Sequence, residues 1–126
     1  MKILIVEADP NRQRQLRTIL TSLGHKSAEV ESVSDSKAAM NTLRKKRFDC
    51  GFVAIGSSTV DGLGLVKEIK TSASSKSIAI VAFSGEVTKE NVIACAEAGA
   101  ASFLAYPFSV SDVESAMKQA LSKAAK

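Results

Sequence analysis

The sequence contains no tryptophan, and aromatic residues make up only 5% of its 126 residues. It therefore shows no base-stacking surface of the kind that binds nucleic acid. The net charge is +4, and the densest basic stretch, residues 44–47, lies where a helix should end. Cations at that place complement the helix dipole, so we interpret the stretch as a solvated helix end rather than a nucleic-acid patch. Nucleic acid is thus not an expected partner of this domain alone.

Long apolar runs and metal-ligand clusters are also missing. No run approaches the roughly 18 apolar residues of a membrane span, and no small-residue cleavage site follows the apolar start. We therefore expect a soluble, unexported protein without a membrane partner. Cys50 and Cys95 lie in apolar segments without C-x-x-C spacing, and His25 has no partner ligand nearby. This excludes a zinc site or a disulfide framework and favours reduced core thiols.

Short apolar runs alternate with longer amphipathic stretches, and this rhythm predicts repeated β–α units. With 45% apolar residues, the chain is sized for one compact domain, expected over residues 1–126. The expected strands are residues 3–6, 26–30, 50–55, 78–83 and 101–105. The expected helices are residues 10–23, 34–46, 63–70 and 89–98, and a last helix from about residue 111. Residues 56–59 are expected to form a loop of small residues, and residues 71–76 a serine-rich connection.

Three of the expected helices begin with capping residues. Asp9 followed by Pro10 fits an N-cap and a first helical position, and Thr88 fits the N-cap of the fourth helix. Ser111 and Glu114 match the S-x-x-E capping box, which places the start of the last helix there.

The alternation predicts an α/β fold with an open, doubly wound, five-stranded parallel sheet. Parallel neighbouring strands need crossover connections, and right-handed crossovers place helices on both faces of the sheet. The working crevice of such a fold lies outside the carboxyl ends of the strands, beside the topological switch point. Function is therefore expected from the few residues that follow the first, third, fourth and fifth strands.

Four segments at these strand ends carry a family likeness. They are ILIVEADP, FDCGFVAIGSSTVDGLGL, SIAIVAFSG and GAASFLAYPF. In this order and spacing the chain resembles the receiver domain of bacterial response regulators in two-component signalling, over its whole length. The resemblance implies the flavodoxin-like receiver fold with strand order 2-1-3-4-5 and a cytoplasmic setting. It also implies that an aspartate after the third strand accepts a phosphoryl group from a histidine kinase.

That aspartate is absent here, because Ala54 stands at the acceptor position by the family pattern. The family also places two acidic residues in tandem after the first strand to hold Mg²⁺, and here only Glu7 remains, followed by Ala8. The family lysine before the proline after strand five corresponds to Tyr106, before Pro107. A phenol near neutral pH supplies a hydrogen bond and no charge. The resemblance further implies a cis Tyr106–Pro107 peptide bond.

Phosphoryl transfer needs a nucleophile, a metal ion and a fixed cation, and all three parts are altered. We therefore expect a degenerate pseudo-receiver that is not an enzyme, has no cofactor and binds Mg²⁺ weakly or not at all. Ser84 matches the family hydroxyl, although it also fits a turn residue that bonds nearby backbone. The predicted degenerate pocket consists of Glu7, Ala8, Asp9, Ala54, Gly56, Ser84, Tyr106 and Pro107.

The leading hypothesis is a phosphorylation-independent protein-interaction module that binds a signalling partner through the fourth helix, fifth strand and fifth helix. The residues of the fourth helix expected to face the sheet are Val92, Ile93, Ala96 and Ala100. This phase leaves Ala94 and Ala98 outward beside Asn91, as a face of small residues that a partner helix can approach. The alanines are also explained as ordinary surface helix formers. The predicted interaction face comprises Asn91, Ala94, Ala98, Phe103 and Tyr106, with Phe103 either a switch aromatic or plain core.

Two alternatives stay open at this point. Asp9 or Asp61 could serve as a displaced phosphoryl acceptor, although Asp9 is better explained as a helix cap and Asp61 lies far along its loop. A small ligand could bind in the pocket at the switch point. A nucleotide has no positive support, because no glycine-rich phosphate loop follows the first strand.

Overall fold

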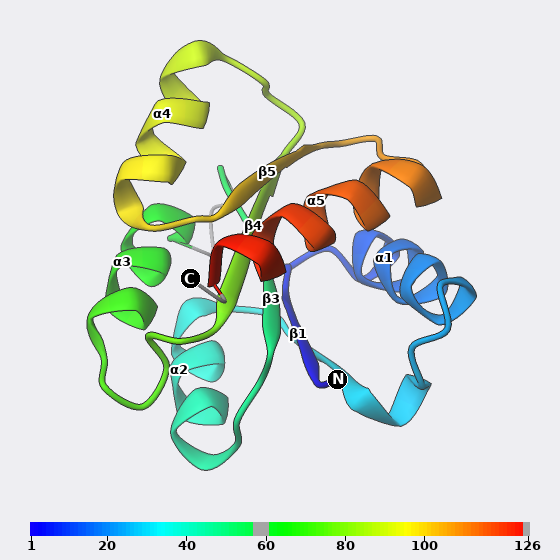
Figure 1. The fold of residues 1–126 in the computed structure, drawn as a ribbon, viewed down its shortest axis with the longest axis horizontal. Coiled ribbons are helices and arrows are strands. Elements are labelled where there is room, and N and C mark those ends of the chain that lie inside the picture. The colour runs from blue at the N-terminus through cyan, green and yellow to red at the C-terminus, as the bar shows by residue number, and fades with distance from the viewer. Residues whose placement is uncertain (57–60, 125–126) are drawn as a thin grey trace.

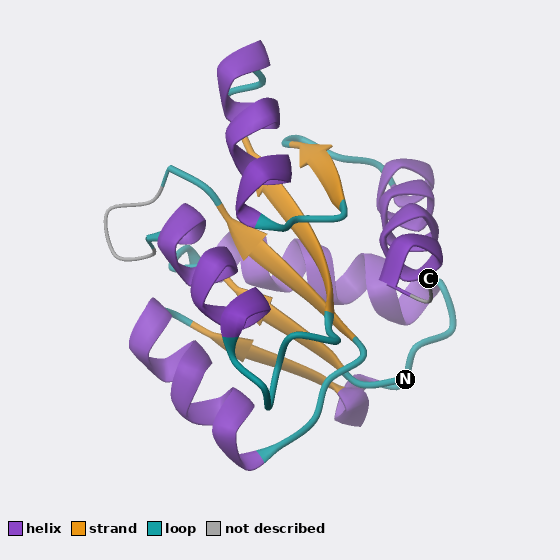
Figure 2. Cartoon of the chain, turned by 60° about the vertical axis from the view of Figure 1, so that its left-hand side comes forward, coloured by secondary structure: helices purple, strands orange, loops and turns teal. Residues whose placement is uncertain are grey.

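A computed structural model describes residues 1–56 and 61–124, which form one five-stranded parallel sheet with helices on both faces (Figures 1 and 2). The strand order is β2-β1-β3-β4-β5, which confirms the predicted doubly wound fold. The strands are β1 Ile3–Val6, β2 Val30–Val33, β3 Cys50–Ala54, β4 Ala79–Ser84 and β5 Ser102–Ala105. The helices are α1 Pro10–Ser22, α2 Ser36–Lys45, α3 Gly62–Thr71, α4 Lys89–Ala98 and α5 Val110–Ala124. Most of the expected 56–59 loop lies outside the described residues.

The sheet is buried between two apolar layers because successive strand residues point to opposite faces. Ile3 and Ile5 of β1 pack under α1 and α5, where Leu16 and Met117 are buried. Leu4 and Val6 face the other layer, in which α2, α3 and α4 cover the sheet. Figure 1 shows the two groups of helices on either side of the strands. No helix of the described ranges is long and apolar enough to cross a membrane.

The predicted caps of α1 and α4 are confirmed. The Asp9 side chain accepts a hydrogen bond from Asn11 N at 2.9 Å, and Pro10 opens α1. Thr88 Oγ1 accepts from Asn91 N at 3.1 Å at the start of α4. Cys50 and Cys95 are both buried and free, as expected, and burial raises the pKa of the Cys50 thiol to about 12.

The predicted second strand is wrong in position. Residues 27–29 form one 3₁₀ turn, and β2 begins only at Val30. In the observed register Val30 pairs with Ile3 and Val33 pairs with Val6. This placement sets the two valines beside the central strand, whereas a strand over 26–30 would have put the exposed Lys26, Ser27 and Ala28 there.

The predicted capping box of the last helix is also wrong by two residues. α5 begins at Val110, and the reciprocal bonds join Ser109 and Asp112 instead of Ser111 and Glu114. Asp112 N donates to Ser109 Oγ at 3.1 Å, and Ser109 N donates to Asp112 Oδ2 at 3.0 Å. Aspartate is short enough to make this return bond, so the S-x-x-D pattern acts as the box.

The predicted phase of α4 is wrong for Val92, Ile93 and Ala96, whereas Ala100, just after the helix, packs against the core as predicted. Ala98 and Cys95 are buried against the sheet, whereas Val92 and Ile93 are 38% and 46% exposed. The Asn91 side chain donates to the Glu86 carbonyl at 3.0 Å, on the half-buried side of the helix. Small side chains on that side let α4 pack against α3 and the sheet. The larger apolar residues therefore face outward.

Gly99 ends α4 in the left-handed conformation, with φ of +116°. A Cβ there would lie 2.6 Å from Lys70 Cγ. We expect Gly99→Ala to lower the free energy of unfolding by at least about 1–2 kcal/mol from backbone strain, and the close approach to Lys70 adds to this loss. Urea unfolding measures this. Gly85→Ala is the control, because a Cβ at Gly85 meets open space, and it should stay within about 0.5 kcal/mol of wild type. Equal losses in both variants would contradict the assigned strain.

Candidate functional site

A pocket of about 330 Å³ lies at the carboxyl ends of β1, β3 and β4. Its lining residues are Glu7, Arg12, Ala54, Ile55, Gly56, Phe83, Ser84, Gly85, Glu86, Asn91 and Tyr106. The structure thus brings together five of the predicted pocket residues, which are Glu7, Ala54, Gly56, Ser84 and Tyr106. Asp9 and Pro107 instead line a separate groove beside α1, and Ala8 lines neither cavity.

Glu7 is the buried carboxylate of this pocket, at 2% exposure. Its Oε1 accepts a hydrogen bond from Asp9 N at 3.1 Å and lies 3.6 Å from Arg12 Nη1. Among the described residues, Oε2 is buried and has no hydrogen-bond partner. Burial raises the pKa of the Glu7 carboxyl above its ordinary value, and the Asp9 N–H and the Arg12 guanidinium offset this only in part.

Arg12 is the cation of the pocket, and sequence reasoning missed it. Its Nε lies 3.8 Å from Asp9 Oδ2, and its guanidinium carbon lies 4.6 Å from the centre of the Tyr106 ring. One side chain from the first turn of α1 therefore lies close to the carboxylates of Glu7 and Asp9 and to an aromatic face. The signal in the sequence is an arginine three residues after a helix-capping aspartate, on the helix that follows the Glu7 strand end.

Tyr106 follows β5 and faces this pocket instead of standing free on the interaction face. Its hydroxyl donates to Gln15 Oε1 at 3.0 Å, and its ring meets Phe108 edge to face at 5.4 Å. The Tyr106–Pro107 peptide bond is cis, as the resemblance implied. The ring thus packs against Arg12, and no charged amine stands at this position.

Ser84 bonds nearby backbone in a turn, as expected if it is a turn residue. Its Oγ accepts from Glu86 N at 3.0 Å, and the residue is 7% exposed. Phe103 is half-buried on β5 and lines a groove between α4 and α5 instead of the central core. The two retained family positions therefore lie in different cavities.

The two carboxylates considered as displaced acceptors both cap helices. Asp9 caps α1, and Asp61 Oδ1 accepts from Gly64 N at 3.2 Å at the start of α3. Neither of them lines the pocket. The donor set also does not fit Mg²⁺, because Ala8 and Ala54 bring no side-chain oxygen and Arg12 faces Glu7. Within the described ranges, no group of three His, Cys, Asp or Glu side chains could hold a metal ion.

Comparison with known proteins identifies the family. Residues 3–118 match the response regulator receiver domain, and the chain belongs to that family. It is 25% identical to the chemotaxis protein CheY-3 of Vibrio cholerae over 114 residues, which cover 90% of this chain and 86% of that protein. It is 27% identical to the sensory/regulatory protein RpfC of Xanthomonas campestris over 109 residues, which cover 85% of this chain and only 15% of that protein.

Among solved structures, the fold resembles a putative response regulator from Chloroflexus aurantiacus, with a TM-score of 0.87 and 25% identity. The match covers 96% of this chain and 97% of that one. A receiver domain of the sensor histidine kinase PA1611 from Pseudomonas aeruginosa has a TM-score of 0.83 at 24% identity. That match covers 96% of this chain and 97% of the other, which has a magnesium ion coordinated in its active site cleft. Receiver domains therefore share this architecture both as separate chains and within longer proteins.

The buried Glu7 carboxylate predicts a specific pH dependence of stability. Its pKa is raised in the folded state, so its contribution to stability is present at low pH and is lost as pH rises through that pKa. Glu7→Gln removes this titration. We expect the melting temperature of E7Q minus that of wild type to become larger as the pH rises from 3.5 to 7.5. Calorimetry measures this, with the exposed Glu86→Gln as control, and a constant difference for E7Q would contradict the assignment.

Proposed function

We propose that this domain is an atypical receiver that binds a signalling protein without being phosphorylated at the usual site. The observation that supports the proposal most is the contact of Arg12 with Glu7 and the Tyr106 ring, beside Ala54 at the acceptor position. A receiver that switches by phosphorylation needs a carboxylate nucleophile and a cation that stabilises the transferred group. In this pocket the acceptor position carries only the methyl group of Ala54, and the Arg12 guanidinium is already paired with the Glu7 carboxylate.

Metal binding in the pocket is expected to be weak or absent. A divalent cation at Glu7 would have to displace Arg12 or lie close to it, and like charges a few ångströms apart repel. Mg²⁺ also prefers several oxygen ligands in octahedral geometry, and of the two acidic residues that line the pocket Glu7 is buried while Glu86 is exposed. The proposed function accordingly has no catalytic step and no cofactor.

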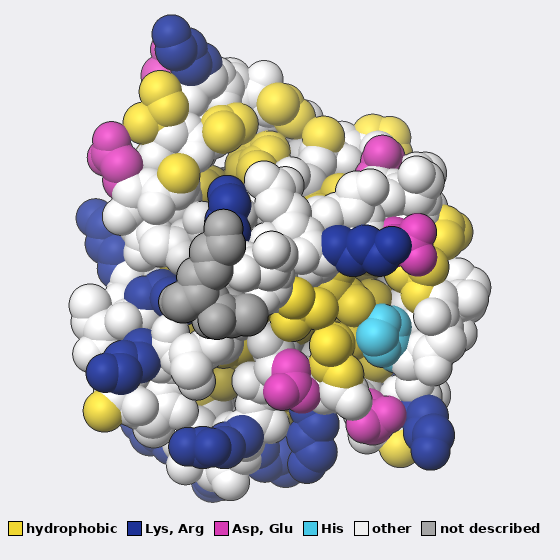
Figure 3. Space-filling view, viewed as in Figure 1, with side chains coloured by type: hydrophobic (Ala, Val, Ile, Leu, Met, Phe, Trp, Pro, Cys, Tyr) yellow, Lys and Arg dark blue, Asp and Glu magenta, His cyan; other side chains and the backbone are white. Residues whose placement is uncertain are grey.

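The proposed partner surface lies on α4, β5 and α5. Three large apolar side chains at the start of α4 and just before it are exposed to solvent. They are Val87, Val92 and Ile93, with exposed fractions of 57%, 38% and 46%. Figure 3 shows hydrophobic side chains gathered over α4 and the chain next to it. Beside them a groove of about 280 Å³ runs between α4 and α5, and Phe103 lies in it. Exposed apolar side chains around a groove are typical of protein-interaction sites.

The corrected phase of α4 changes which residues serve as anchors. Ala98 is buried, and Ala94 and Asn91 are half-buried on the same side of the helix. The partner we propose therefore meets Val92, Ile93 and the exposed Ala96, whereas the small-residue face predicted earlier is partly covered, with Ala98 buried. We infer a partner that covers a shallow apolar surface in the cytoplasm of a bacterial cell.

Ile93→Glu tests this surface directly. A partner captured from the native host is identified and purified, and its dissociation constant is measured by calorimetry. We expect I93E to weaken binding at least tenfold, since a buried anchor would become a charge, with stability within about 0.5 kcal/mol of wild type. Asn41→Glu adds the same charge to an exposed position on α2 and should leave affinity unchanged. Equal affinity of I93E, or binding that requires an acyl-phosphate donor with Mg²⁺, would contradict the proposal.

A further inference from the structure

Two sequence features that the proposed function does not use meet at the opposite end of the sheet. The basic stretch 44–47 ends α2 and leads into β3, and the serine-rich connection after α3 leads into β4. Because β3 and β4 are hydrogen-bonded neighbours, the two connections arrive side by side at the amino ends of these strands. Figure 3 shows Lys and Arg side chains gathered along this lower edge of the molecule.

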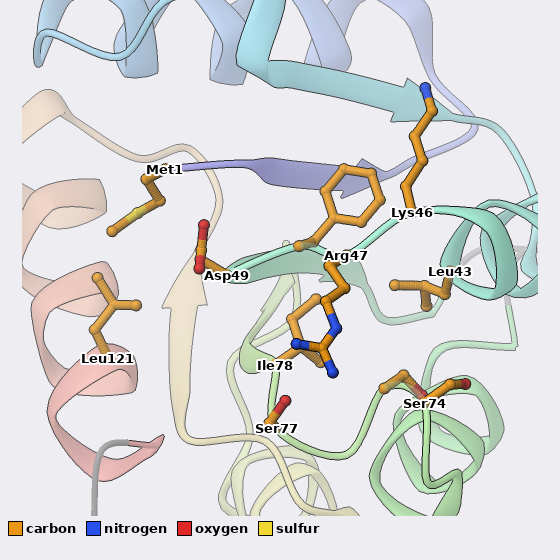
Figure 4. A pocket seen from close by; sticks show the side chains of 11 residues that line it. Met1, Leu43, Lys46, Arg47, Asp49, Ser74, Ser77, Ile78 and Leu121 are labelled. Atoms are coloured by element: carbon orange, nitrogen blue, oxygen red, sulfur yellow. The ribbon is translucent and has the colours of Figure 1, made fainter.

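A pocket of about 330 Å³ lies between the two connections. This volume is at the small end of the range for ligand sites. Its polar lining includes Arg47, Ser74 and Ser77, which are all exposed at the pocket mouth. Its apolar lining includes Leu43 and Ile78, which are buried beneath it. Figure 4 shows Arg47 extending from the β3 side toward Ile78 and the Ser77 hydroxyl.

Arg47 is the cation of this pocket that remains available. Neighbouring Lys46 points away from it, as Figure 4 shows, and its Nζ pairs with Glu31 Oε1 at 2.8 Å on β2. No hydrogen bond or ion pair is found for the Arg47 guanidinium within residues 1–56 and 61–124. A guanidinium presents several N–H donors in a planar fork that matches the oxygens of a phosphoryl group.

The serine-rich connection is held in place by its own hydrogen bonds. Buried Ser75 donates through Oγ to the Ile69 carbonyl at 2.8 Å, and Lys70 Nζ donates to the Ile78 carbonyl at 2.9 Å. The Ser72 and Ser74 hydroxyls lie 3.1 Å apart. These contacts fix the backbone that carries Ser77 opposite Arg47, so the pocket is formed before any ligand arrives.

Asp49 is the acidic residue of this pocket and lies away from the Ser77 end. Its Oδ2 accepts from Lys2 N at 2.8 Å, and Figure 4 places it on the Met1 side of the pocket, away from Ser77. A ligand anion is repelled from that end and attracted to Arg47. Figure 4 shows Ile78 beside Arg47, Leu43 on the other side of Arg47 and Leu121 on the Met1 side, and these apolar side chains offer a surface for an organic group.

We propose that this pocket binds a small organic phosphate monoester. The phosphoryl group lies against Arg47 and the Ser77 hydroxyl, and the organic group packs on Leu43 and Ile78. The site lies at the amino ends of the strands, whereas the degenerate pocket lies at their carboxyl ends. The proposal does not depend on the proposed function. It assigns to the basic stretch a role beyond that of a solvated helix end.

The test is a titration of ¹⁵N-labelled protein with phenyl phosphate, followed by backbone amide shifts. We expect saturable shifts centred on Arg47, Ser74 and Ser77, with about tenfold weaker binding to Arg47→Gln and a smaller loss for Ser77→Ala. Arg44→Gln is the matched control, because Arg44 belongs to the same basic stretch, does not line the pocket and donates to Asn41. Its affinity should equal that of wild type. Arg47 is exposed, so R47Q is expected to fold, and its melting curve checks this.

Inorganic phosphate and phenol separate the two halves of the ligand. Both should bind more weakly than phenyl phosphate, because each uses only one part of the pocket. Inorganic phosphate binding as tightly as phenyl phosphate would overturn the role of the apolar surface and with it the proposal. The proposal would also be overturned by unsaturable shifts, by shifts spread over all basic residues, or by equal loss of affinity in R44Q and R47Q.

Discussion

The candidate site depends on one physical constraint, a carboxylate buried at the end of the central strand. Glu7 is almost inaccessible to water, and a buried charge is costly unless a partner offsets it. Here the partner is Arg12, which belongs to the same chain and is placed by the helix that directly follows β1. An internal cation does not dissociate and needs no metal. Arg12 thus offsets part of the cost of burying Glu7, and the raised pKa of the carboxyl shows that the rest is not offset.

The other departures from the family pattern are consistent with this arrangement. Arg12 already faces Glu7, so carboxylates at positions 8 and 54 would add negative charge without a further cation beside them. The alanines found there add no charge and leave the pocket compact. Tyr106 offers a ring face to the guanidinium, whereas a lysine at that position would repel it. These features agree with the proposed function, in which α4, β5 and α5 bind a partner without phosphorylation at the usual site.

The alternation of strands and helices could be predicted from the sequence because its signals are local and repeated, whereas the strand order was implied by the family resemblance. Apolar runs marked the strands, and Asp9 and Thr88 marked the starts of α1 and α4. Errors arose where local pattern and tertiary contact disagree. On α4, the β-branched Val92 and Ile93 suggested an inner face, but the structure buries the smaller Cys95 and Ala98 against the sheet. Five pocket residues were predicted from strand ends, whereas Arg12 was not, since its reach across the pocket depends on side-chain conformation.

The most direct test of a receiver pocket that is not phosphorylated at the usual site is an amide-shift titration with Mg²⁺ and beryllofluoride, which mimics a phosphoryl group on an aspartate. The account predicts that the resonances of Ala54, Ser84 and Phe103 do not move, because there is no acceptor carboxylate and Arg12 already faces Glu7. Saturable shifts at these residues would contradict it and would direct attention to Asp9 and Asp61 as relocated acceptors.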